Sequence, residues 1–188
     1  MATPNNTENQ STASPASLEK QQALQHLHNN ELARADSLLG EICRENPDDH
    51  EAWLLRGIVE NRCGHLDAAL ASFHRALALR PDYPKAHQNL TSTLLASNRH
   101  HELIAATRAA LRYIPEDADL HCKLAIGLER THQLEEARVA AEDALRITPG
   151  HARTIVTPVS YTHLRAHETE RLISYAVFCL KRGGGGGG

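Results

Sequence analysis

The stretch from His50 to Pro81 reads HEAWLLRGIVENRCGHLDAALASFHRALALRP, and it decides the fold. Small and large residues hold fixed places in it, with Gly57 eighth, Phe73 twenty-fourth and the closing proline thirty-second. Prolines of this kind recur at one constant interval along the chain, at Pro47, Pro81, Pro115 and Pro149. A constant interval of this size indicates that one supersecondary unit has been copied along the chain.

Each of these prolines stands where a helix must stop. Proline has no N–H for an intrahelical bond, and it keeps the residue before it out of the α region. Between the prolines, apolar residues recur at spacings of three and four, which is the period of a helix with one buried face. We expect Gly64 and Asn98 to end helices in a left-handed conformation. The pattern predicts helices near residues 17–29, 32–45, 51–63, 66–79, 84–97, 100–113, 118–131 and 134–147.

These residues resemble the tetratricopeptide repeat (TPR) family, whose helix–turn–helix unit of about 34 residues carries W-x2-L-G, A-x3-F and a closing proline. The resemblance covers residues 16–149 and is most specific in the second unit, which keeps Trp53 and Gly57. Arg56 and Glu60 depart from it, because leucine and an aromatic residue are usual at these places. The resemblance implies an all-α TPR solenoid, in which stacked units bury the apolar stripes that no unit can bury alone.

The period also divides the chain into segments. Residues 1–15 are rich in Asn, Thr, Ser and Pro, and we expect them to be a disordered tail. Residues 150–157 stand where a fifth repeat would begin, before the pattern is lost. The four expected repeats span 16–47, 50–81, 84–115 and 118–149.

Residues 158–188 resemble a translated sequencing adapter followed by a poly-G read. The stretch from Val159 to Glu168 matches one adapter block codon by codon, and the stretch from Ile173 to Leu180 matches a second block in the same frame. The closing run of glycine matches the G that an instrument reports when signal is absent. We therefore expect this segment to be non-native and the natural gene to continue past residue 157.

Composition excludes several classes of function. The net charge of −3 gives no basic stripe for a nucleic acid. No apolar run approaches the roughly 18 residues of a membrane span, and the N-terminus shows no secretory signal. The four cysteines have no spacing typical of a zinc site or a disulfide framework. We expect a cytoplasmic protein with neither a nucleic-acid nor a membrane partner.

No constellation in the sequence predicts catalysis. There is no nucleophile elbow, P-loop or dinucleotide fingerprint. His87 and His121 both hold the fourth place of a repeat, but stacked helices about 10 Å apart would keep them from sharing a metal ion. We expect them to be polar substitutes for the usual residue. The sequence therefore predicts no catalytic residue, no metal and no cofactor.

The surface left for function is the inner wall of the superhelix, which the first helix of each repeat lines in this family. Apolar residues beside amides and charges suit an extended or helical peptide. A carboxylate clamp for a chaperone's C-terminus is not completed, since Leu24 and Leu55 stand where it needs asparagine. The peptide-binding groove predicted from the resemblance consists of Leu54, Ile58, Asn61, Lys85, Gln88, Asn89, Ser92, Cys122, Lys123 and Ile126.

The sequence thus predicts a scaffold or adaptor that binds a protein or peptide ligand, and no enzyme in the chain as given. An alternative is the N-terminal interaction module of a larger enzyme, similar to a sulfotransferase or a glycosyltransferase, whose catalytic domain lies outside this sequence. That alternative rests on analogy between repeat arrays. A long α/β region downstream in the gene would favour it, and a stop after one or two more repeats would favour the adaptor.

Overall fold

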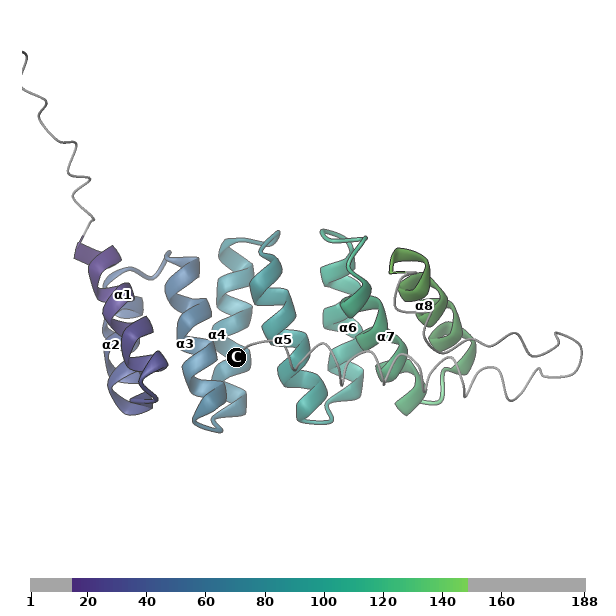
Figure 1. Ribbon diagram of the computed structural model, residues 1–188, viewed down its shortest axis with the longest axis horizontal. Helices are drawn as coiled ribbons and strands as arrows, with labels where there is room; N and C mark the ends of the chain where they lie inside the picture. Colours follow the sequence, from purple (N-terminus) through teal and green to yellow (C-terminus); the bar gives the residue numbers. More distant parts are fainter. Residues whose placement is uncertain (1–14, 149–188) are drawn as a thin grey trace, which may run out of the picture.

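The computed structural model describes residues 15–148, which form a row of antiparallel helical hairpins (Figure 1). The all-α prediction is confirmed, and each helix lies within two residues of its expected range. Pro15, expected in the tail, is the first residue of a helix, a place that suits proline. The helices are α1 (Pro15–His28), α2 (Leu32–Glu45), α3 (His50–Arg62), α4 (Leu66–Leu79), α5 (Pro84–Ala96), α6 (His100–Leu111), α7 (Ala118–Arg130) and α8 (Leu134–Ile147).

Three expected segments lie outside the described residues. These are the N-terminal tail up to residue 14, the start of a fifth repeat at 150–157, and the adapter-like segment 158–188. The division of the chain into four repeats with the expected boundaries stays a prediction.

The odd-numbered helices form the inner layer of the row. Helix α1 contacts α3, α3 contacts α5 and α5 contacts α7, whereas the even-numbered helices make no comparable contact with one another within the described residues. These contacts place α1, α3, α5 and α7 side by side in one layer. The resemblance implies that this layer is the inner surface, and we call its members the inner helices.

Close packing inside a hairpin depends on one glycine. Phe73 of α4 is fully buried, and its ring lies against the backbone of α3 at Gly57. A Cβ atom at Gly57 would lie 2.5 Å from Cε1 and 2.7 Å from Cδ1 of that ring. Only glycine leaves the space that the phenylalanine fills.

The turns inside the four hairpins share one left-handed residue. These residues stand one repeat apart and have positive φ angles: Asn30 (60°), Gly64 (82°), Asn98 (57°) and His132 (61°). The N–H that follows each of them donates to a carbonyl five residues back, as His65 N does to Glu60 O at 2.9 Å. This is the Schellman arrangement at a helix C-terminus. The expectation for Gly64 and Asn98 is confirmed, and the structure adds the other two.

The proline turns between hairpins are closed by a ring at the fourth place of the next repeat. Trp53 Nε1 donates to the carbonyl of Pro47 at 2.9 Å. His87 Nε2 lies 2.8 Å from the carbonyl of Pro81, and His121 Nε2 lies 2.9 Å from that of Pro115. Because a carbonyl only accepts, these bonds require the Nε2–H tautomer. The histidines thus replace tryptophan as hydrogen-bond donors, which confirms that they are polar substitutes.

The two departures from the family pattern compensate each other. Glu60 is buried in α3, and its Oε1 accepts from Arg56 Nε at 3.0 Å one helical turn away. Its Oε2 accepts from Ser72 Oγ of α4 at 2.6 Å. A buried carboxylate is costly unless it is paired and hydrogen-bonded. Here an ion pair and a hydroxyl satisfy it where the usual repeat has apolar residues.

Candidate peptide-binding surface

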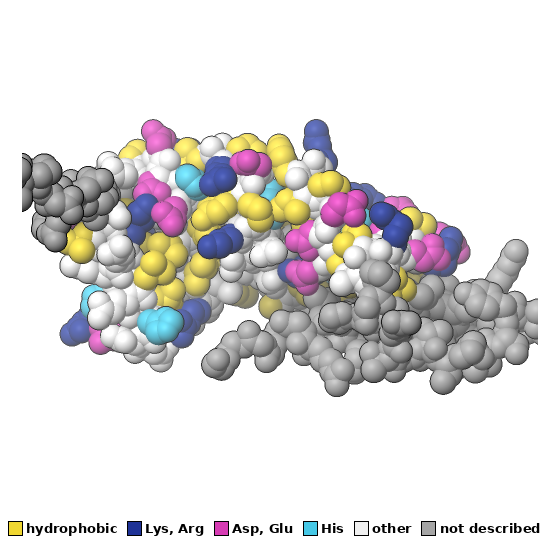
Figure 2. Space-filling model, turned by 45° about the horizontal axis from the view of Figure 1, so that its top comes forward, with side chains coloured by type: hydrophobic (Ala, Val, Ile, Leu, Met, Phe, Trp, Pro, Cys, Tyr) yellow, Lys and Arg dark blue, Asp and Glu magenta, His cyan; other side chains and the backbone are white. Residues whose placement is uncertain are grey.

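All ten residues of the predicted groove lie on the inner helices α3, α5 and α7. Ile58, Asn61 and Asn89 are partly exposed, and Lys85, Gln88 and Ser92 are exposed. The four remaining residues, which are Leu54, Cys122, Lys123 and Ile126, are buried. Figure 2 shows hydrophobic side chains reaching the surface in several patches between charged ones. The surface that a ligand could contact is therefore smaller than the predicted set.

We call the line of contact between two neighbouring inner helices a seam. The first seam, between α1 and α3, is closed by an ion pair: Lys20 Nζ lies 2.9 Å from Asp49 Oδ2 and 2.8 Å from Glu51 Oε2. Burial opposes both charges. The bonds of Lys20 to Glu51 and Asp49 outweigh burial and raise the pKa of Lys20, while bonds from Lys20 and the Ala52 amide lower the pKa of Asp49.

The opposite end of the first seam is closed by Arg62. Its guanidinium donates to the carbonyl of Leu27 at 3.0 Å and to Asn30 Oδ1 at 3.1 Å. Both acceptors belong to the preceding hairpin. The first seam is thus bonded at its two ends by side chains of the chain itself.

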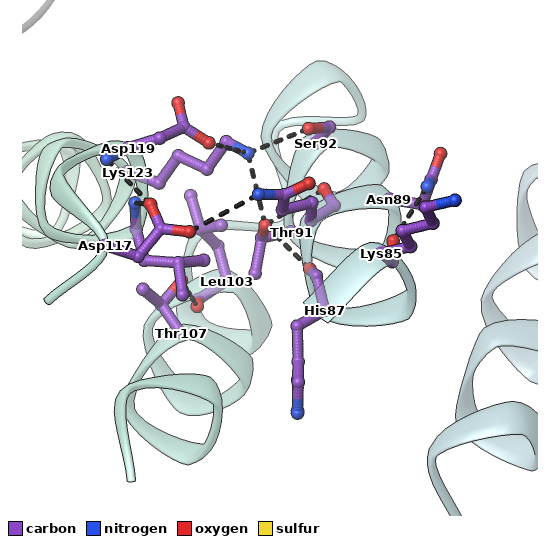
Figure 3. Close-up of polar contacts among 12 residues, drawn as sticks. Lys85, His87, Asn89, Thr91, Ser92, Leu103, Thr107, Asp117, Asp119 and Lys123 are labelled. Atoms are coloured by element: carbon purple, nitrogen blue, oxygen red, sulfur yellow. Dashed lines mark hydrogen bonds and ion pairs between the residues drawn. The ribbon is translucent and has the colours of Figure 1, made fainter. Parts of the chain in front are cut away.

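The third seam, between α5 and α7, is closed by Lys123 (Figure 3). Its Nζ lies 2.6 Å from Asp119 Oδ2, 2.9 Å from Ser92 Oγ and 3.3 Å from Thr91 Oγ1. An ammonium group has three N–H donors, and these three acceptors use them all. Gln88 Nε2 adds a bond to Asp117 Oδ2 at 3.3 Å across the same seam. The Lys123 predicted for ligand binding holds two repeats together.

The second seam, between α3 and α5, is different. Within residues 15–148 no hydrogen bond or ion pair joins these two helices. Leu54 packs in one cluster with Leu90, and the His50 ring lies edge-on against Tyr83, the residue before α5, with ring centroids 5.1 Å apart. Asn89 Nδ2 donates to the carbonyl of Lys85 in its own helix at 2.8 Å. Figure 3 shows Lys85 and Asn89 on the side of α5 away from Lys123. The polar side chains of Lys85 and Asn89 at the second seam therefore make no bond to α3, unlike the lysines at the first and third seams.

The predicted groove omits two apolar residues of the inner layer. Leu24, on α1, holds the place in its repeat that Ile58 holds in the next, and its side chain is 43% exposed. Leu27 holds the place that Asn61 holds in the next repeat and is partly buried. The repeat period was the signal that could have found both. Leu24 and Leu27 add apolar side chains on α1 to the apolar side chain of Ile58 on α3.

The described part offers little for metal or thiol chemistry. No three potential metal-ligating side chains come together within residues 15–148. Burial raises the pKa of the Cys43 thiol to about 11, so this thiol stays protonated at neutral pH. No helix in the described range has the length and apolar character that crossing a bilayer requires.

Helical hairpins with a constant register and a continuous inner face define a TPR-like helical-repeat solenoid. Solved structures of MamA share this fold. A MamA RS-1 ArsTM double mutant is 21% identical with a TM-score of 0.68, over 92% of this chain and 97% of that chain. MamA 41-end from Desulfovibrio magneticus RS-1 is 19% identical with a TM-score of 0.67, over 88% of this chain and 93% of that chain. A further crystal structure of MamA protein is 19% identical with a TM-score of 0.68, over 88% of this chain and 88% of that chain.

No protein-family model and no curated protein sequence matches the chain. At such low identity, likeness to MamA shows the fold alone.

Proposed function

We propose that this protein is a scaffold that binds a protein or peptide partner on its inner face, across the second seam. The observation that supports this is the contrast between the seams. The first and third are bonded by Lys20 and Lys123, whereas no hydrogen bond or ion pair joins the described residues of α3 to those of α5. Ile58 and Asn89 stand beside that contact with part of their surface exposed.

The chemistry of this surface suits a peptide better than a small polar molecule. An extended peptide carries one N–H and one C=O per residue, and each needs a partner when water is removed. The amides of Asn61 and Asn89 supply both donors and acceptors at such a surface. Ile58 and Leu24 supply apolar area for a partner's side chain, at about 25 cal/mol per Å² buried. Nothing in the described residues favours the alternative of an enzyme module.

The proposal can be tested by selecting random peptides displayed on phage against the immobilised full chain. Ile58→Asp places a charge on the proposed surface, and we expect it to abolish enrichment. Val139→Asp is the matched control, because Val139 is 49% exposed on α8, outside the inner layer. Equal enrichment on the parent chain and on Ile58→Asp would refute the proposal, as would a complete lack of enrichment.

A further inference from the structure

Lys85 lacks the partner that the repeat supplies elsewhere on the inner face. The second place of a repeat lies across the seam from the fifth place of the repeat before it. At the first seam these two are Glu51 and Lys20, whose side chains bond at 2.8 Å. At the second seam the same two places hold Lys85 and Leu54. The exposed Lys85 therefore stands at a place whose counterpart across the seam is apolar.

The carboxylates at the second place of the neighbouring inner helices are already engaged. Glu51 pairs with Lys20, and Asp119 pairs with Lys123. Lys85 makes no ion pair with any described residue. The positive charge at the second seam is thus uncompensated by the described part of the chain.

Asn89 shows the same mismatch one helical turn further along α5. The sixth residue of an inner helix faces the ninth of the one before it, as Lys123 faces Ser92 at 2.9 Å. At the second seam this places Asn89 opposite Ile58. The amide N–H₂ of Asn89 donates to its own helix, and its Oδ1 accepts from no described donor. An acceptor in this place suits a backbone N–H of a bound chain.

We propose that the second seam selects an extended peptide with an acidic side chain two residues away from a large apolar one. The carboxylate binds Lys85 Nζ, a backbone N–H donates to Asn89 Oδ1, and the apolar side chain packs on Ile58. This inference rests on the proposed function and names the ligand of that same surface. It is charge complementarity at Lys85 that selects the acidic residue.

The spacing follows from the same pairing. Lys85 lies across the seam from Leu54, which precedes Ile58 by four residues. At a rise of about 1.5 Å per residue this corresponds to about 6 Å along the helices. An extended chain advances about 3.3 Å per residue and points every second side chain to the same face, which gives about 7 Å. Two residues of an extended peptide therefore span the two contacts.

The test repeats the peptide selection on the full chain carrying Lys85→Glu. We expect the parent chain to enrich peptides with the acid–x–apolar spacing, and Lys85→Glu to enrich a basic residue at the acidic place. A peptide selected on the parent, synthesised with an amidated C-terminus, should bind Lys85→Glu at least about tenfold more weakly, as expected for the loss of one charge-assisted hydrogen bond. Lys85→Met should lose the acidic preference and keep the apolar one.

Arg112→Glu is the matched control. Arg112 is exposed at the end of the outer helix α6, so the change alters net charge equally and leaves the second seam untouched. Selection of the same peptides by the parent and by Lys85→Glu would overturn the inference, and so would binding that requires a free C-terminal carboxylate. Enrichment that depends on Ile58 and not on Lys85 would sink this inference alone. A lack of enrichment on the parent would sink the proposed function with it.

Discussion

Three helical glycines form a natural series in which one substitution should have three different outcomes. Gly40, Gly57 and Gly127 all lie inside helices, so alanine gains about 1 kcal/mol of helix propensity at each. What differs is the space around the new methyl group. Nothing lies within 4 Å of a Cβ at Gly40, whereas a Cβ at Gly127 would lie 3.0 Å from Ile104 Cγ1. At Gly57 it would lie 2.5 Å from the Phe73 ring.

The balance of the two terms decides each sign. Gly40→Ala should raise the free energy of unfolding by about 1 kcal/mol, since only the propensity term acts. Gly127→Ala should change it by less than about 0.5 kcal/mol, because a slight shift of the Ile104 side chain costs about what the helix gains. Gly57→Ala should lower it by about 1–2 kcal/mol, because overpacking costs up to about 3 kcal/mol and the fully buried Phe73 ring has no room to move.

Urea unfolding of the full chain, followed by far-ultraviolet circular dichroism, measures all three changes. The slope of each transition must match that of the parent, because repeat arrays can lose two-state behaviour. If Gly57→Ala stabilises as much as Gly40→Ala does, Phe73 does not pack on α3 as described. If Gly40→Ala does not stabilise, the open space around Gly40 has been misjudged.

Other predictions follow from the turns, the buried pair and the cap. His132→Gly should raise stability by about 1 kcal/mol and Gly64→Ala should lower it by about as much, because an L-residue is strained at positive φ; urea midpoints check this, and equal midpoints would contradict it. Glu60→Leu should cost about 1–3 kcal/mol by stranding Arg56 and Ser72, and adding Arg56→Leu should recover most of it; a double mutant as unstable as the single one would refute the pairing. Burial opposes the charge of Asp49, yet bonds from Lys20 and the Ala52 amide lower its pKa. Its stabilisation is therefore present above the unfolded pKa of about 3.9 and is lost as pH falls below that value. Asp49→Asn should weaken the dependence of the urea midpoint on pH between pH 5 and pH 3, and an unchanged dependence would contradict the role given to Asp49.

The helices could be predicted because their signals are local and repeated. Pro47 and Pro81 end helices wherever they occur, and Gly64 marks a left-handed turn by its residue type. His132 could be found only through the period, since histidine is not a usual turn residue. It stands one full repeat after Asn98 and has the same left-handed conformation.

The candidate site was harder to predict than the fold. The sequence predicts which residues face inward, but not which of them the chain uses for its own cohesion. Lys123 and Lys85 look alike in a list of groove residues, yet Lys123 is bound by Ser92 and Asp119, while Lys85 is exposed and makes no ion pair with a described residue. The difference depends on the neighbouring repeat, which is distant in the sequence. The ion pair between Arg56 and Glu60 was not predicted, because each residue taken alone looks like a departure from the repeat pattern.

The contrast between the seams also has a mechanical meaning. A row of hairpins pulled from its ends behaves as a spring whose coils are the contacts between neighbours. Hydrogen bonds and ion pairs at the first and third seams break over a short extension, whereas the apolar contact at the second can slide while it stays partly buried. Tension should therefore spread α3 and α5 before the other inner helices. A partner bound across α3 and α5 would strengthen the contact that yields first. A mechanical load that spreads these two helices would therefore lower the affinity of the scaffold for that partner.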